Sequence, residues 1–346
     1  MSAFPEVVAY DADDDEALAA AELAHQVASL GIDKPFVIAS AKGHDLAAQV
    51  EGSRPPRIAI SDTDQDWAAE TGARALAEGV DAIVAVGGGR CLDVAKLAAA
   101  RAGVVNIAVP TQLSHDGICS PVAVVPNDQG RNESLGAVEP RLVFLSLPTL
   151  IKAPADSLAA GVGDLLANPL ALRDWALAAE RGLEEIDQRA WDLSVESFEQ
   201  IENDLDRATS ETAKDESFHR RLADALILSG MAMIMAGTSR PASGSEHEIS
   251  HAIDELFGGR AMHGAQVAFG CIFSVALYGE DVEAFRQRLR TLGLPEHPSD
   301  LELTERELLD VLLAAPDTRP GRFGILEDAN LDESSADALV RKIWQE

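Results

Sequence analysis

The chain has 346 residues, of which 47% are hydrophobic and 25% are charged, so it is long enough for two globular domains around a buried core. It carries 58 acidic residues against 28 basic ones, a formal net charge of −30. Contacts to nucleic acids and anionic membranes depend on clustered cations, so this balance excludes both as expected partners.

The three cysteines, Cys91, Cys119 and Cys271, are widely spaced and form no Cys-x-x-Cys motif. This usage is typical of a reducing compartment rather than of a disulfide scaffold. The first residues lack the basic and apolar regions of a signal peptide, and the longest apolar run, 225–237, is too short to cross a bilayer. We therefore expect a cytoplasmic protein with no membrane partner.

The first half of the chain alternates short apolar runs with helical patterns. Predicted strands cover 34–40, 57–61, 81–86, 104–110 and 141–146, and predicted helices cover 13–30, 66–79 and 91–102. Residues 122–138, with a turn sequence from Pro126 to Gly130 at their centre, suit a hairpin. This alternation indicates βαβ units and a largely parallel sheet.

After Pro148 only helical patterns remain. They cover residues 155–183, 187–204, 217–237, 244–256, 262–278, 281–292, 304–315 and 331–345. We therefore predict an α/β nucleotide-binding domain over residues 1–153 and an all-α domain over residues 154–346.

Three glycines, Gly87, Gly88 and Gly89, stand between a predicted strand and a predicted helix. Glycines let the backbone approach a phosphate, and the amides at a helix N-terminus favour anions. The spacing matches neither Gly-x-Gly-x-x-Gly nor a Walker loop, so a tight strand-to-helix turn is the alternative. The context favours pyrophosphate binding. Lys96, one turn into the helix, is either solvated or paired with Asp93.

The loop 110–121 follows the next strand and is rich in hydroxyl groups. Ligands of an open α/β sheet bind beyond the carboxyl ends of its strands, so this loop lies where a ligand is expected. Turns with side-chain caps have the same composition, which leaves the loop ambiguous by itself. Asp164, in an otherwise apolar helix, is explained either by metal ligation or by helix capping.

Three of the eight histidines fall between residues 247 and 263. His247 and His251 are four apart, so they share one face of a helix. His263 follows the pair Gly258-Gly259 and opens the next predicted helix. Two helices could therefore bring three imidazoles to one metal ion. The spacing matches no His-Glu-x-x-His signature, and ordinary surface or core histidines are the alternative.

Five stretches carry a resemblance to a known family when they are taken together. They are Gly-Gly-Gly-Arg-Cys-Leu-Asp-Val-Ala-Lys (87–96), Pro-Thr-Gln-Leu-Ser-His-Asp-Gly-Ile-Cys-Ser-Pro (110–121), Gly-Val-Gly-Asp (161–164), Arg-Pro-Ala-Ser-Gly-Ser-Glu-His (240–247) and Met-His-Gly (262–264). In this order they resemble the sn-glycerol-1-phosphate dehydrogenase family, whose superfamily also contains glycerol dehydrogenase and dehydroquinate synthase. The resemblance implies a dehydroquinate synthase-like fold, with an α/β nucleotide-binding domain followed by an all-α domain that binds metal and substrate.

The resemblance also implies a role for each matched residue. Residues expected to hold the cofactor pyrophosphate are Gly87, Gly88, Gly89, Arg90 and Cys91, with further cofactor contacts from Thr111, Ser114 and Ser120. Residues expected to bind a divalent metal, usually zinc, are Asp164, His247 and His263. Asp116 and His251 are the expected catalytic residues, both in contact with substrate. Three protein ligands leave a coordination position open, as in catalytic zinc sites.

The implied reaction interconverts dihydroxyacetone phosphate and sn-glycerol 1-phosphate, a step in phospholipid biosynthesis, with NAD or NADP. His251 is the candidate for relaying the proton to the reduced oxygen, and hydrogen bonding to substrate alone is the alternative. The phosphate of this three-carbon substrate needs a cation. Arg240 is a candidate, although it equally suits a structural ion pair. The apolar helices leave open whether they form a homo-oligomer face or a core.

Two departures from the family pattern stand out. The first eighty residues show no recognisable opening strand with its glycine-containing turn, which leaves the choice between NAD and NADP open. Leu113 replaces a usually smaller residue and is expected to narrow the cleft. Alternative functions are a glycerol or polyol dehydrogenase, a dehydroquinate synthase-like cyclase, or a non-catalytic protein on the same fold. The cyclase branch usually has Glu in place of Asp164, and its phosphate-binding lysines have no counterpart here.

Overall fold

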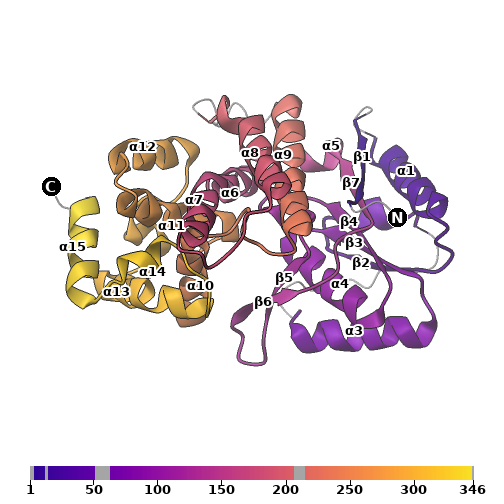
Figure 1. Ribbon diagram of the computed structural model, residues 1–346. Helices are drawn as coiled ribbons and strands as arrows, with labels where there is room; N and C mark the ends of the chain where they lie inside the picture. Colours follow the sequence, from indigo (N-terminus) through magenta and orange to yellow (C-terminus); the bar gives the residue numbers. More distant parts are fainter. Residues whose placement is uncertain (1–3, 12–14, 51–62, 206–214, 345–346) are drawn as a thin grey trace.

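The computed structural model describes residues 4–11, 15–50, 63–205 and 215–344. Its first half is a five-stranded parallel sheet in the order β1-β7-β4-β3-β2. The strands are β1 (Glu6–Tyr10), β2 (Pro35–Ala39), β3 (Ala82–Gly87), β4 (Val105–Pro110) and β7 (Leu142–Ser146). The sheet occupies one side of the molecule in Figure 1, and the helical half occupies the other. The predicted α/β-plus-α fold class is confirmed.

Both faces of the sheet are covered, which explains why its strands are continuously apolar. Val84, Ile107 and Phe144 point to one face, where α1 (Glu16–Ser29) packs. Ile83 and Leu145 point to the other face, into the large core shared with the helical half. The remaining helices of this half are α2 (His44–Ala47), α3 (Gln65–Glu78), α4 (Gly89–Ala102) and α5 (Leu147–Leu150).

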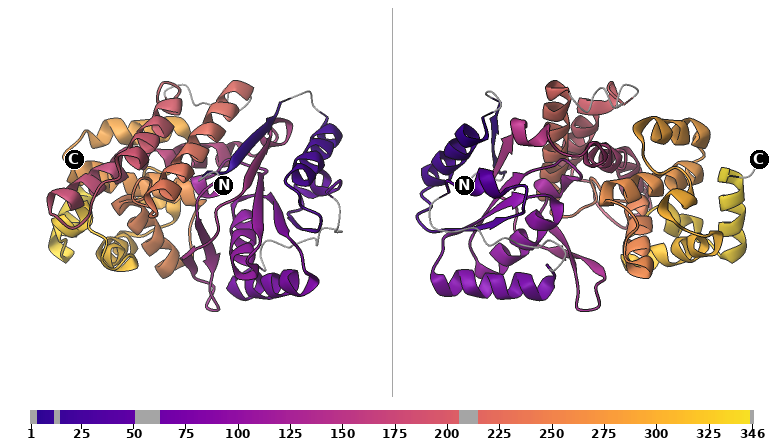
Figure 2. Two further views of the ribbon diagram at one scale, coloured as in Figure 1. Left: turned by 45° about the vertical axis from the view of Figure 1, so that its right-hand side comes forward. Right: turned by 180° about the vertical axis from the view of Figure 1, so that it is seen from behind.

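Strands β5 (Val122–Pro126) and β6 (Asn132–Gly136) form a separate antiparallel hairpin, as the turn sequence predicts. The hairpin extends from the sheet half in Figures 1 and 2 and reaches beside α10. It follows directly on the loop 110–121, so its position is tied to that loop. This arrangement places the hairpin on the border between the two halves.

The described residues of the second half form helices and no strand. They are α6 (Ala155–Leu165), α7 (Asn168–Glu180), α8 (Gln188–Glu202), α9 (Glu216–Ala236), α10 (Ser245–Phe257), α11 (His263–Leu277), α12 (Val282–Leu292), α13 (Glu305–Ala314), α14 (Ile325–Ala329) and α15 (Glu333–Trp344), with the 3-10 turns η4 (Pro298–Leu301) and η5 (Ala315–Thr318). A further 3-10 turn, η2 (Asp116–Ile118), lies in the first half, in the loop between β4 and β5. Helix α11 is central, and it packs on both α6 and α10. Its residues 264–276 are all buried.

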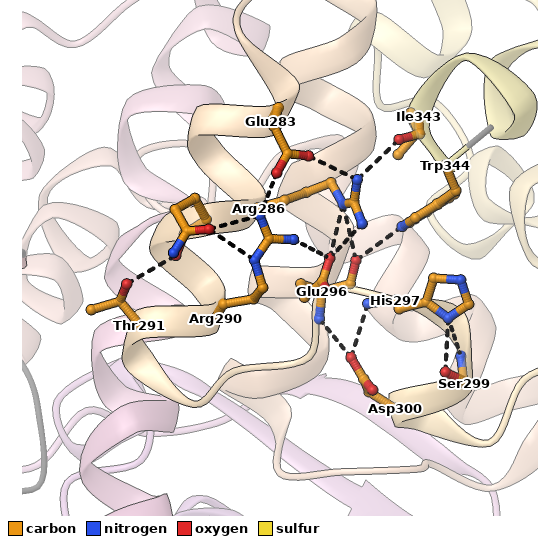
Figure 3. Close-up of polar contacts among 11 residues, drawn as sticks. Glu283, Arg286, Arg290, Thr291, Glu296, His297, Ser299, Asp300, Ile343 and Trp344 are labelled. Atoms are coloured by element: carbon orange, nitrogen blue, oxygen red, sulfur yellow. Dashed lines mark hydrogen bonds and ion pairs between the residues drawn. The ribbon is translucent and has the colours of Figure 1, made fainter. Parts of the chain in front are cut away.

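The final helix is fastened by a polar cluster between α12, α15 and the segment that follows α12 (Figure 3). Arg286 donates from Nη1 to the Ile343 carbonyl at 3.2 Å, and its Nη2 pairs with Glu296 at 2.7 Å. The indole of Trp344 donates to the Glu296 carbonyl at 3.0 Å. The cluster lies far along the helical half from the sheet, so we assign it to stability rather than to the site.

Most predicted elements are confirmed within one to three residues, with two differences. The sequence shows no recognisable opening strand, but the structure has one: the short, partly exposed β1 pairs in parallel with β7. The predicted helix 155–183 is two helices, because Pro169 has no amide proton to continue the hydrogen bonds of α6 and instead lies in the first turn of α7. The predicted strand 57–61 lies outside the described residues. The domain boundary at residue 153 stays a prediction, and no helix in the described part of the chain could span a membrane.

Candidate active site

The glycine turn and the hydroxyl-rich loop are neighbours because the strands before them are paired. Gly87 lies opposite Pro110 in the β3–β4 register, and the Thr111 amide donates to the Gly87 carbonyl at 3.0 Å. Helix α4 starts at Gly89, with Gly88 as an N-cap that offers no side-chain acceptor. The first-turn amides of α4 therefore have no capping partner and face the edge where the two loops meet.

The predicted pyrophosphate residues divide into a pocket wall and its support. Gly89 and Arg90 line the pocket described below. Gly87 is packed tightly against Cys91, where an added Cβ would collide with that side chain. The Cys91 thiol contacts the Ile38 carbonyl at 3.7 Å, and burial raises its pKa to about 12. Cys91 can therefore offer only its backbone amide to a ligand.

Lys96 fastens the hydroxyl-rich loop to α4. Its side chain is 1% exposed, and Nζ pairs with Asp93 Oδ1 at 2.9 Å. The same ammonium donates to the Gly117 carbonyl at 2.8 Å and also to the Val122 carbonyl. The sequence left two predictions open for Lys96: the ion pair with Asp93 is confirmed, and the solvent-exposed side chain is wrong.

The loop presents polar groups to the pocket from its middle. Ser114, Asp116 and Ser120 line the pocket, whereas Thr111 is buried beside the glycine turn. Ser229 on α9 donates to Asp116 Oδ2 at 2.8 Å. Burial, opposed in part by this hydrogen bond, raises the pKa of Asp116 to about 6. The orientation of the Asp116 carboxyl is therefore fixed from α9.

Close helix packing brings the expected metal ligands together. Gly163 on α6 meets the backbone of Gly264 on α11, and an added Cβ at either glycine would collide with the facing helix. Gly270 similarly allows α11 to lie against the Glu246 backbone of α10. These contacts set Asp164 beside His263 and His247. Consecutive left-handed glycines, Gly258 at φ 78° and Gly259 at φ 79°, turn the chain from α10 into α11.

The three groups form a compact ligand set. One ligand atom each from Asp164, His247 and His263 lie within 4.8 Å of one another. Nε2 of both histidines is 3.8 Å from Asp164 Oδ1, a buried oxygen with no hydrogen-bond partner among the described residues. Nδ1 of His247 lies 3.0 Å from Glu246 Oε1, which fixes the orientation of that ring. His251 lies beside the cluster, with its ring 6.4 Å from those of His247 and His263.

The electrostatics of the cluster suit a dication. Burial and the nearby Asp116 raise the pKa of Asp164 well above its ordinary range. Burial lowers the pKa of His263 to about 4 and that of His247 well below its ordinary range. Both imidazoles are therefore neutral, the form that binds metal, and the carboxylate lacks a counter-charge that a bound cation would supply. The set fits a divalent metal.

The cluster opens into one pocket of about 390 Å³ together with the first turn of α4. The pocket wall includes Gly89, Arg90, Ser114, Asp116, Ser120, His247, His251 and His263. The predicted cofactor face and the predicted metal face therefore share one cavity, on the border between the sheet half and the helical half.

Known proteins with a similar sequence show the family of this chain. The glycerol-1-phosphate dehydrogenase of Cenarchaeum symbiosum is 37% identical over 75% of this chain and 71% of that protein. The one of Methanocorpusculum labreanum is 31% identical over 94% of this chain and 91% of that protein. The chain belongs to the glycerol-1-phosphate dehydrogenase family. A sequence profile described as iron-containing alcohol dehydrogenase matches residues 16–154.

The fold of this glycerol-1-phosphate dehydrogenase family member also occurs among solved structures. A probable glycerol dehydrogenase from Sinorhizobium meliloti superposes with a TM-score of 0.77 at 23% identity, over 98% of each chain. At that identity the likeness concerns the fold alone. It places the chain in the dehydroquinate synthase-like architecture that the motifs imply.

Three further side chains of this family member complete the description of the pocket and its surroundings. Arg240, the candidate for substrate phosphate, is 1% exposed, pairs with Glu184 and donates to the Phe323 carbonyl at 2.9 Å, so it is a structural ion pair. Leu113 is 1% exposed in the core and does not narrow the cleft. Arg319, which no motif of the sequence singled out, lines the pocket beside His251.

Substitution of Gly89 by alanine is expected to weaken NADH and NADPH binding about tenfold. A Cβ at this position would collide with the His115 imidazole and stand in front of the first-turn amides. A fluorescence titration of reduced cofactor measures the effect. Gly136→Ala is the matched control, because a Cβ there meets nothing within 4 Å. Equal dissociation constants for the two variants would contradict the assignment of the cofactor to this turn.

Proposed function

We propose that this chain reduces dihydroxyacetone phosphate to sn-glycerol 1-phosphate, reversibly, with NADH or NADPH and a divalent metal. The observation that carries the proposal is the shared pocket, where His247 and His263, which converge with the buried Asp164, face the same space as the first turn of α4. One carboxylate with two imidazoles and an open position is the ligand type of catalytic zinc, so zinc is our choice of metal. Relatives named glycerol-1-phosphate dehydrogenase [NAD(P)+] support the substrate class and both cofactors.

Asp164, His247 and His263 would hold the metal, with the Glu246 carboxyl keeping the His247 ring in place. When bound, the metal supplies a Lewis acid for the C2 carbonyl oxygen and the nicotinamide supplies the hydride. Gly89 and Arg90 bind the cofactor pyrophosphate through the first turn of α4. Asp116 accepts a hydrogen bond from a substrate hydroxyl, which orients the carbon chain.

His251 is positioned for the proton that the reduced oxygen requires. It lines the pocket, and Arg319 Nη2 lies 3.4 Å from its Nε2. Burial and the Arg319 charge lower the pKa of His251 well below its ordinary range, so the ring is neutral. We infer that it relays a proton: one ring nitrogen gives its proton to the oxygen at C2 while the other takes up a proton from solvent, so the ring stays neutral and ends as the other tautomer.

The three cysteines are free and buried, which fits catalysis in the reducing cytoplasm.

In an assay of zinc-loaded protein we expect rapid oxidation of NADH or NADPH with dihydroxyacetone phosphate, and rates at least about tenfold lower with dihydroxyacetone. The product is expected to be the 1-phosphate enantiomer. Turnover confined to free dihydroxyacetone would favour a glycerol dehydrogenase instead. Silence with both ketones, despite bound metal and NAD, would favour the cyclase alternative.

A further inference from the structure

Two arginines face the helical side of the pocket from the segment between η5 and α14. Arg319 lines the catalytic pocket, and both Arg319 and Arg322 line an adjoining cavity of about 360 Å³. The two cavities share Ser239 and His251. Both guanidinium groups are therefore directed at one polar space next to the ligand cluster.

Neutral groups hold these guanidinium groups in place. Arg319 Nη1 donates to Ser243 Oγ at 2.6 Å and, more weakly, to Ser239 Oγ at 3.3 Å. Arg322 Nη2 donates to Ser239 Oγ at 3.0 Å, and its Nη1 donates to the Ser243 carbonyl. The two side chains are thus oriented by the loop between α9 and α10, and this loop contains no carboxylate.

No carboxylate of the described residues lies within ion-pairing distance, 4.0 Å, of either guanidinium. This is unusual in a chain with 58 acidic residues, where the neighbouring Arg240 is paired with Glu184. Asp254 also lines both cavities, but Gln266 Nε2 donates to its Oδ1 at 2.9 Å and Asn132 donates to its Oδ2 at 3.4 Å. Glu246 and Glu248 on α10 act on both arginines at longer range, and Glu133 and Glu255 also lie in the wall of the adjoining cavity. Two partly buried cations with no directly paired carboxylate still favour an anionic ligand.

The position of the pair limits what that anion can be. Arg319 lies one imidazole beyond the metal-ligand cluster, since its Nη2 is 3.4 Å from His251 and His251 stacks 6.4 Å from His263. The cofactor pyrophosphate is expected at the opposite wall, at Gly89 and Arg90. A short substrate whose carbonyl group lies at the metal-ligand cluster would therefore place its other end near the guanidinium groups.

We propose that Arg319 and Arg322 form the phosphate subsite that makes the enzyme specific for a phosphorylated three-carbon ketone. The planar guanidinium group suits bidentate contact with a phosphate, and Ser239 and Ser243 orient both guanidinium groups toward the cavity where this phosphate would bind. The proposal rests on the proposed function for its reaction, but the subsite itself is an anion site that can be tested without turnover. Arg319 is then both a substrate contact and a neighbour of the His251 ring.

Arg319→Gln tests the subsite by comparing two ketones. We expect kcat/KM for dihydroxyacetone phosphate to fall about 100-fold, chiefly through KM, and the value for dihydroxyacetone to fall less than about tenfold. Arg319→Lys keeps the charge without the fork and is expected to retain part of the preference. Arg181→Gln is the matched control, because it removes a surface cation that is paired with Asp328.

Inorganic phosphate supplies a second readout that needs no turnover. We expect phosphate to raise the unfolding temperature of the wild-type holoenzyme and of Arg181→Gln, and this rise to be lost in Arg319→Gln and Arg322→Gln. A variant at Arg319 with the wild-type ratio of the two ketone rates would overturn the proposal. If wild type prefers free dihydroxyacetone while phosphate still stabilises it through Arg319, the anion subsite stands and the proposed function fails.

Discussion

Replacement of His263 by alanine is expected to remove the bound metal and to lower turnover about 1000-fold or more. Two protein ligands, Asp164 and His247, would remain, which is one fewer than catalytic zinc sites use. Lewis-acid stabilisation is worth several kcal/mol, and each 1.4 kcal/mol is a factor of ten in rate, so its loss accounts for this magnitude. Metal content by elemental analysis and turnover with dihydroxyacetone phosphate measure the two effects.

His25→Ala is the control for the loss of an imidazole, because His25 is exposed on α1, on the far face of the sheet half. It should keep both metal and activity. Exhaustive chelation of the wild-type protein should reproduce the His263→Ala phenotype, and added zinc should restore the wild type alone. Full turnover by metal-free protein would rule out the proposed mechanism.

The metal ligands were predictable as residues, whereas their convergence was not. His247 and His263 stand out by their crowding in the sequence, and Asp164 stands out as a carboxylate in an apolar helix. Their meeting depends on Gly163 and Gly264, which let α6 and α11 approach until the backbones touch. A single sequence gives no sign of which two helices use such glycines against each other.

The arginine pair shows a different limit of sequence analysis. Arg319 lies 68 residues from His251, and its segment follows a 3-10 turn with no recognisable motif. The lack of a paired carboxylate beside Arg319 can be recognised only when the positions of the acidic residues are known, and the sequence does not give these positions. By contrast, the break between α6 and α7 was readable from Pro169, and the opening strand was hidden because β1 is short and partly exposed.

Substitution of Lys96 by methionine is expected to destabilise the protein by about 3–5 kcal/mol, because it leaves the buried Asp93 carboxylate without its partner. The carbonyls of Gly117 and Val122 would also lose their donor. We expect the midpoint of thermal unfolding to fall by roughly 5–10 °C. Cofactor affinity should fall as well, since the loop that carries Ser114 and Ser120 would no longer be fixed to α4.

Lys152→Met provides a matched comparison, since both lysines lie 2.9 Å from a carboxylate, but Lys152 and Glu16 are exposed. An exposed pair contributes less than about 1 kcal/mol, so this variant should unfold near the wild-type temperature. Adding Asp93→Asn to Lys96→Met should recover about half of the lost stability, because it removes the unpaired charge and keeps an acceptor for the Val124 amide. If the double variant is no more stable than Lys96→Met alone, the cost comes from the orphaned loop carbonyls rather than from the buried charge.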